Sequence, residues 1–134
     1  MTDALSKLLQ DRDWLLADGA TGTNLLVRGL ETGYSPELWN VERPDDIQGL
    51  HASFFDAGSD LMLTNSFGGN ALRLKLHDAQ DRVTELNAAA ARLARKKAAT
   101  ATVMQRRPLL VAGSMGPTGE LFEPMGALTH VTTR

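Results

Sequence analysis

Residues 60–70 read DLMLTNSFGGN, a short apolar run that ends in a loop of small polar residues and glycine. Residues 14–23 (WLLADGATGT) and residues 109–119 (LLVAGSMGPTG) repeat this pattern on either side. Short apolar runs that turn polar only at their carboxyl end are typical of buried parallel strands. In barrels and open α/β sheets, that end of the strands is where ligands bind. We therefore expect the chemistry of this chain to lie in the three loops.

Helical sequence separates the three runs. Apolar residues at helical spacing predict helices over about residues 45–57 and 81–99. With strands at about residues 14–17, 60–64 and from residue 109, the order is β, α, β, α, β, which predicts right-handed crossovers and a parallel sheet. Three parallel strands leave two open edges and a sheet too narrow to cover its helices. The chain is therefore predicted to be the front part of a larger α/β domain.

The composition is that of an ordinary globular protein. Of the 134 residues, 43% are hydrophobic and 22% are charged. A net charge of -2 gives no electrostatic argument for binding nucleic acid or an anionic membrane. The basic residues at 92–97 lie in an Ala-rich helical pattern and are interpreted as a solvated helix face. The lack of a signal-peptide pattern, and of any apolar stretch near the ~18 residues of a membrane span, favours the cytoplasm.

The sequence contains no cysteine. This excludes disulfides, thiolate metal sites and a thiol nucleophile. The three histidines, His51, His77 and His130, are far apart and show no ligand spacing. We therefore predict no metal site built from this chain.

Two loops carry the candidate binding residues. Asp18 and Gly19 follow the first apolar run, where a carboxylate can pair with an ammonium group and exposed N–H groups can hold an anion. The alternative is a tight turn in which Asp18 caps a helix. Thr64 and Asn65 end the next run with short hydrogen-bonding side chains. Asp18, Gly19, Thr64 and Asn65 are the predicted substrate-binding residues, because all four are expected at one end of the sheet.

Three segments together resemble a known family: residues 15–23, 57–67 and 112–119. They are similar, in order and spacing up to about His130, to the homocysteine S-methyltransferases. The likeness is greatest to the bacterial betaine–homocysteine methyltransferase type. The family fold is a (β/α)₈ barrel, and such barrels run to ~250 residues or more. The resemblance thus implies an incomplete barrel domain over residues 1–134, with about three βα units from the N-terminal part of the fold.

The resemblance also implies a reaction, the zinc-dependent transfer of a methyl group to the sulfur of homocysteine, which gives methionine. In the family, three cysteines from later strands hold the zinc, which lowers the pKa of the bound thiol so that a thiolate attacks the methyl carbon. None of those cysteines is present here. The resemblance therefore implies a chain with no catalytic residue and no metal ligand of its own, inactive without the rest of the fold.

The resemblance assigns roles to three positions. Asp18 and Gly19 match the pair that holds the amino-acid portion of homocysteine. Tyr34 falls where betaine-using members place an aromatic ring near the cationic methyl donor, and a ring face attracts a quaternary ammonium group. One position departs from the pattern, because Gly68 stands where a donor-contacting tyrosine would be expected.

Two other hypotheses remain at this stage. The chain is either a self-contained small α/β module that binds an anion with its loop at residues 19–22, or one half of a split enzyme. In the second case, a separate chain supplies the remaining strands and the zinc cysteines. The resemblance implies homocysteine and a methyl donor (betaine or another) as partners, and the split enzyme adds a complementing C-terminal half. Neither hypothesis calls for nucleic acid or a membrane.

Overall fold

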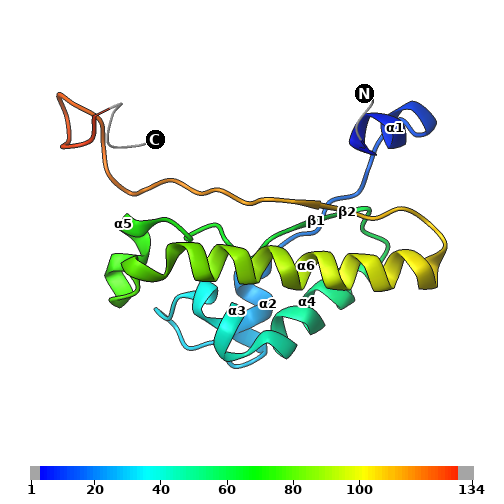
Figure 1. The fold of residues 1–134 in the computed structure, drawn as a ribbon, viewed down its shortest axis with the longest axis horizontal. Coiled ribbons are helices and arrows are strands. Elements are labelled where there is room, and N and C mark those ends of the chain that lie inside the picture. Colours follow the sequence, from blue (N-terminus) through cyan, green and yellow to red (C-terminus); the bar gives the residue numbers. More distant parts are fainter. Residues whose placement is uncertain (1–3, 130–134) are drawn as a thin grey trace.

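The computed structural model describes residues 4–129, which form helices packed on a short parallel sheet (Figure 1). The α-helices are α1 (Ala4–Asp11), α2 (Thr21–Val27), α3 (Trp39–Glu42), α4 (Pro44–Asp56), α5 (Ala71–Leu74) and α6 (Val83–Gln105). The 3₁₀ helices are η1 (Pro36–Leu38), η2 (Lys75–His77) and η3 (Gln80–Arg82). The strands are β1 (Leu61–Leu63) and β2 (Leu110–Ala112). None of the helices in this range is long and apolar enough to cross a membrane.

β1 and β2 pair in parallel with Met62 opposite Val111, as the apolar runs predicted. The prediction of a strand at residues 14–17 is wrong, because this segment forms only one parallel bridge, between Ala17 and Leu61. The pairing is too short for a ladder: Leu61 N–H donates to the Leu16 carbonyl (3.1 Å), and Asp18 N–H donates to the Leu61 carbonyl (3.0 Å). The segment still runs beside β1, so the three apolar runs lie side by side.

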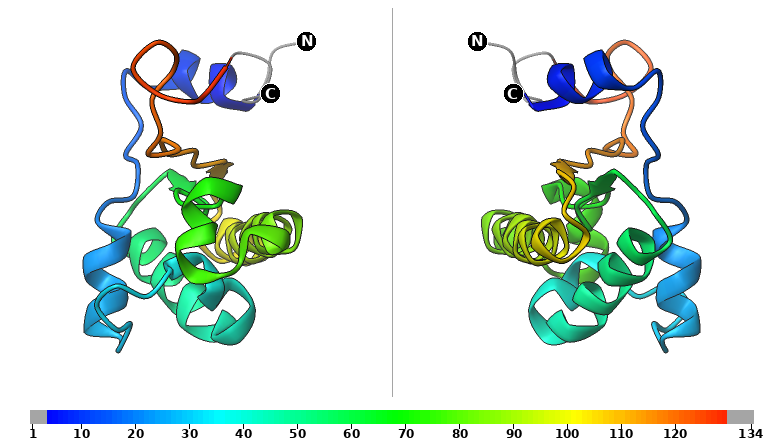
Figure 2. Two further views of the ribbon diagram at one scale, coloured as in Figure 1. Left: turned by 90° about the vertical axis from the view of Figure 1, so that its left-hand side faces the viewer. Right: turned by 90° about the vertical axis from the view of Figure 1, so that its right-hand side faces the viewer.

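The helices cover one face of the sheet. The two side views in Figure 2 place α2 to α6 on that side, and α1 and residues 121–129 on the other. Alternate strand residues face the helices, so Met62 is fully buried against Phe55 of α4 and Ala98 of α6, with Val111 packed beside them. A second cluster around Ile47 joins α2, α3 and α4. The core therefore lies between the sheet and the helical layer.

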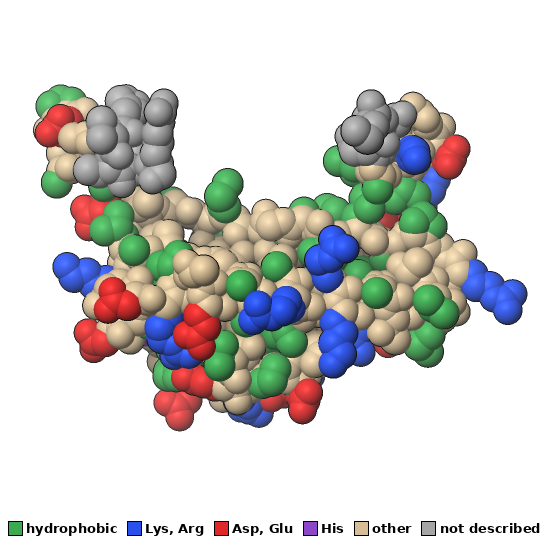
Figure 3. Space-filling view, in the orientation of Figure 1, with side chains coloured by type: hydrophobic (Ala, Val, Ile, Leu, Met, Phe, Trp, Pro, Cys, Tyr) green, Lys and Arg blue, Asp and Glu red, His purple; other side chains and the backbone are tan. Residues whose placement is uncertain are grey.

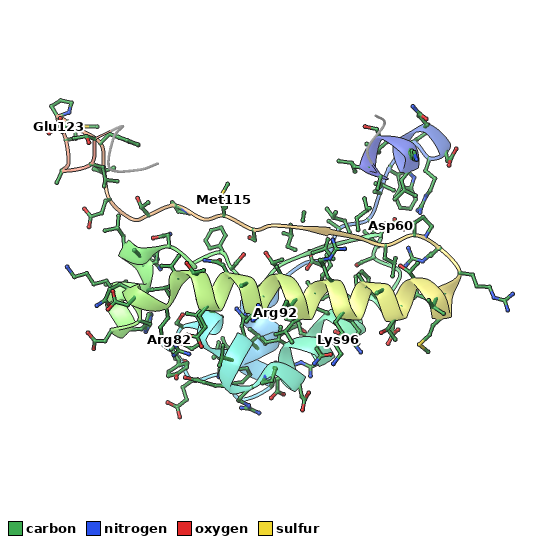
Figure 4. The ribbon with its side chains drawn as sticks, viewed as in Figure 1. Asp60, Arg82, Arg92, Lys96, Met115 and Glu123 are labelled. Carbon is green, nitrogen blue, oxygen red and sulfur yellow. The ribbon has the colours of Figure 1, made fainter. Side chains whose placement is uncertain are left out.

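The long helix α6 extends the length of the molecule (Figure 1). It begins near the predicted start but continues to Gln105, beyond the predicted end at residue 99. The added turns are held because Ala101 is buried in the cluster around Met62. Alanines on the inner face allow α6 to lie close to α4. Arg92 and Lys96 lie on the exposed side of α6 (Figure 4), and Figure 3 shows Lys and Arg side chains at the surface of this face. Both observations support the interpretation of the basic stretch as a solvated face.

The other face of the sheet is open. Within residues 4–129, β2 has only β1 as a partner strand. On this side Leu63 is 38% exposed, and Met115, which projects away from the helices in Figure 4, is 94% exposed. An unpaired strand edge beside an apolar face is a site of association.

We therefore expect the chain to self-associate as its concentration rises. Sedimentation velocity over a wide range of concentrations should show a rising average mass, and Met115→Glu should reduce the effect by placing a charge on the open face. A clean monomer at high concentration, with one cooperative unfolding transition, would contradict this expectation.

Candidate functional site

A cavity of about 510 Å³ lies at the carboxyl end of the strands. All three predicted loops contribute to its wall: Gly22 follows the first run, Thr64 follows β1 and Ser114 follows β2. Tyr34, in the loop that leads into η1, and Glu37, in η1 itself, close another side. The cavity thus lies where a parallel sheet places its ligands.

Asp18 is partly buried against a residue that lines the cavity, but neither Asp18 nor Gly19 is itself one of the lining residues. Its Oδ2 accepts a hydrogen bond from the N–H of Leu63 (3.2 Å), and Leu63 lines the cavity. Its Oδ1 is buried and has no hydrogen-bond partner among the described residues. Burial raises the pKa of Asp18, although the Leu63 N–H and the aspartate's own N–H act in the opposite direction. The alternative of a helix cap is wrong, because α2 has no side-chain cap and Asp18 bonds to β1 instead.

Thr64 ties the loops after β1 and β2 together. Its hydroxyl lies 2.7 Å from that of Ser66 and accepts from the N–H of Ser114 (3.0 Å). The Ser66 hydroxyl donates to the Ser114 carbonyl (2.8 Å). Next to this contact, a Cβ at Gly116 would lie 2.5 Å from the carbonyl oxygen of Phe67, so only glycine allows the two loops to approach so closely. Thr64 therefore shapes the cavity wall as well as lining it.

Asn65 also lines the cavity, but both hydrogens of its side-chain amide are used within the protein. They go to the carbonyl of Pro36 (2.8 Å) and to Oδ1 of Asn40 (3.0 Å). The Asn40 amide in turn donates to the Asn65 carbonyl (2.8 Å). This reciprocal pairing fixes η1 and α3 against the end of β1.

Glu37 is a cavity residue that the sequence reasoning missed. It is only 6% exposed, and its carboxylate accepts hydrogen bonds from the Ser35 hydroxyl and the Gly68 N–H, each at 2.7 Å. The signal in the sequence was faint, because one glutamate in a polar loop usually lies in solvent. A Cβ at Gly68 would lie 3.0 Å from Glu37 Oε1, so the carboxylate takes the space beside this glycine.

Tyr34, for which the resemblance predicts a place near the methyl donor, lines the cavity with 38% of its surface exposed. Its hydroxyl donates to Glu42 Oε2 (2.8 Å), and this hydrogen bond raises the pKa of Tyr34. The hydroxyl therefore stays protonated at neutral pH, and the ring remains available to a ligand.

The fold is that of an α/β chain with a cavity at the carboxyl end of its parallel sheet, which is where such sheets place their ligands. Residues 15–134 match the family model described as homocysteine S-methyltransferase. The chain belongs to the homocysteine S-methyltransferase family.

Individual relatives agree with this assignment. The chain is 38% identical over 125 residues to homocysteine S-methyltransferase of Escherichia coli (strain K12), covering 86% of this chain and 39% of that protein. It is 36% identical over 124 residues to methionine synthase of Mycobacterium leprae (strain TN), covering 87% of this chain and 10% of that protein. The chain therefore spans about two-fifths of the first relative and about one-tenth of the second.

Solved structures give the same result. The metallated form of the homocysteine methyltransferase MmuM from Escherichia coli matches with a TM-score of 0.77 at 31% identity, over 87% of this chain and 42% of that one. The oxidized form of MmuM matches with the same TM-score at 32% identity. The mixed helix and strand fold is thus that of a part of this methyltransferase.

The metallated relative raises the question of whether this chain fits a metal. The sequence contains no cysteine, and no three His, Asp or Glu side chains within residues 4–129 are grouped so that they could hold one. His130 lies outside the described residues. The residues described here therefore do not fit a zinc site.

Proposed function

We propose that this chain is the substrate-holding part of a homocysteine S-methyltransferase, built as the first βα units of a (β/α)₈ barrel. In this proposal residues 1–134 form one partial domain that transfers no methyl group without the remainder. The family match supports this function over the small anion-binding module. The zinc cysteines of the family would come from the remainder, in the same polypeptide or in a separate chain.

The observation that carries the proposal is the unpartnered oxygen of Asp18. A buried carboxylate oxygen without a hydrogen bond is unfavourable, and an ammonium group would satisfy it. The N–H of Leu63 fixes the other oxygen, so the carboxylate is already oriented. The amino group of homocysteine has the charge that this carboxylate would pair with, and Gly19 follows Asp18 with no side chain of its own. Thr64 and Asn65 complete this side of the site, and Tyr34 is proposed to face the methyl donor.

The experiment joins this chain to the C-terminal part of Escherichia coli homocysteine S-methyltransferase that the match leaves uncovered. The 134-residue chain by itself should bind no stoichiometric zinc, and the fusion protein should bind zinc and methylate homocysteine. In the fusion protein, Asp18→Asn should weaken homocysteine binding by roughly ten- to a hundredfold, since a charge-assisted contact contributes about 1.5–3 kcal/mol. Zinc content and folding should be nearly unchanged.

Asp13→Asn is the matched control, because Asp13 is exposed and its replacement removes the same charge. Isothermal titration with homocysteine, together with metal analysis, measures both effects. If Asp18→Asn unfolds the protein while homocysteine affinity per folded molecule stays constant, Asp18 is a structural residue and the assignment is wrong.

A further inference from the structure

The carboxylate of Glu37 is buried in the cavity wall without a cation. Ion pairs within residues 4–129 join arginines to Asp46, Asp60 and Glu85, and none involves Glu37. Asp60, the other deeply buried carboxylate, is paired with two arginines. Glu37 has only the Ser35 hydroxyl and the Gly68 N–H. A buried charge is unfavourable unless it is paired, so Glu37 is the group in this wall with most to gain from a cationic ligand.

Aromatic rings line the same cavity. Tyr34 is 38% exposed and Phe67 is 61% exposed, so both rings are accessible to a ligand. Ring faces attract organic cations, most strongly where water is excluded. A carboxylate together with two rings is a suitable environment for a positively charged group that carries methyl or methylene carbons.

The cavity wall also contains two basic side chains, Arg73 and His77. Arg73 is exposed, and solvent and salt screen its charge. Neither of them lies within 4 Å of the Glu37 carboxylate, because no such pair occurs among the ion pairs of the described residues. The buried charge of Glu37 is therefore screened less than that of Arg73.

We propose that Glu37 determines specificity in this cavity, by selecting ligands with a permanent positive charge over neutral ligands of the same shape. The inference deepens the proposed function, since it concerns the methyl-donor side of the same cavity. A purely structural Glu37 would only hold the loop after β1 through Gly68, and the charge of the ligand would then make no difference to binding.

The test uses the 134-residue chain and two probes of the same shape. Choline carries a trimethylammonium group, and 3,3-dimethylbutan-1-ol replaces its nitrogen with carbon and is neutral. NMR chemical-shift titration gives the affinity for each. We expect choline to bind about tenfold more tightly than the neutral alcohol. Glu37→Gln keeps an oxygen for the Gly68 N–H but removes the charge, so it should abolish this preference and leave the affinity for the alcohol unchanged.

Glu31→Gln is the matched control, because Glu31 is exposed and lies outside the cavity wall, and its replacement removes the same charge. It should retain the preference for choline. The proposal is overturned if the unaltered chain binds both probes equally or binds neither, a comparison that requires no variant to fold. It is also overturned if Glu37→Gln folds and keeps the preference. Homocysteine binding and methyl transfer by the fusion protein are measured separately, so the proposed function can fail without this inference failing.

Discussion

Replacing Asp60 with asparagine will lower the free energy of unfolding by about 3 kcal/mol, or leave the chain unfolded if its stability is smaller than that. Asp60 is 1% exposed at the start of β1. Its Oδ1 accepts from Arg12 (2.7 Å) and from Arg107, and its Oδ2 accepts from the N–H of Leu16 (2.9 Å). Asparagine has one acceptor oxygen, so its NH₂ group would face a donor, and the arginines would lose their counter-charge.

The pKa of Asp60 agrees with this interpretation. Burial by itself would raise the pKa, but the hydrogen bonds from Arg12 and Leu16, with the charges of Arg12 and Arg107, lower it below its ordinary value of 3.8. A carboxyl group with a lowered pKa stabilises the folded state at neutral pH. That contribution is lost as the pH falls below the ordinary value and through the lowered one.

Urea unfolding at low protein concentration measures the change. Asp56→Asn is the control, because Asp56 is exposed on α4 and its replacement removes the same charge. Arg12→Ala should have a smaller effect than Asp60→Asn, since the Arg12 side chain is 40% exposed and Arg107 would still pair with Asp60. Equal midpoints for Asp60→Asn and Asp56→Asn would show that the cluster contributes nothing to stability.

His51 gives the second large effect, a loss of stability in mild acid. It is 1% exposed on α4, and neither ring nitrogen has a hydrogen-bond partner among the described residues. Burial, with a smaller effect from the charge of Lys97, lowers the pKa of His51 from 6.5 to about 4. Between these values the unfolded chain binds a proton that the folded chain does not. Stability should therefore fall as the pH drops from about 6.5 to about 4, by about 3 kcal/mol in total.

His51→Leu should remove this loss and raise stability at pH 7 by about 1–2 kcal/mol, since the substitution takes two unpartnered polar atoms out of a buried site. The measurement is the free energy of unfolding at several pH values for both proteins. Carboxylates titrate in both, so the difference between the two curves isolates His51. Parallel curves would mean that His51 is not buried as a neutral ring, and the prediction would be wrong.

The sequence predicted β1, β2 and α6 because their signals are local. Apolar runs that end in polar loops specify the strands, and helical spacing specifies the inner face of α6. The end of α4 was also predictable, since Gly58 adopts a φ of 105°. The sequence did not reveal that residues 14–17 form a single bridge and not a strand. The length of a strand depends on how many hydrogen bonds its neighbour makes with it, and that neighbour, β1, is distant in the sequence.

The candidate site was predictable in place but not in detail. Asp18 and Thr64 each follow an apolar run and could be located from the order of these runs along the chain. Glu37 could not, because its burial depends on Gly68, 31 residues further along the chain. Asp60 reads as an ordinary polar residue before a strand, and its arginines are 47 and 48 residues away. Long-range contacts of this kind leave no trace in local periodicity.

The reciprocal pairing of Asn40 and Asn65 has a consequence for protein engineering. Each amide donates to the segment that carries the other, so the stretch at residues 36–40 and the loop after β1 have complementary surfaces. A segment swap with a homologue that replaces only one of them would leave buried amide groups facing the wrong partners. The two segments, although distant in the sequence, should be transplanted together as one module.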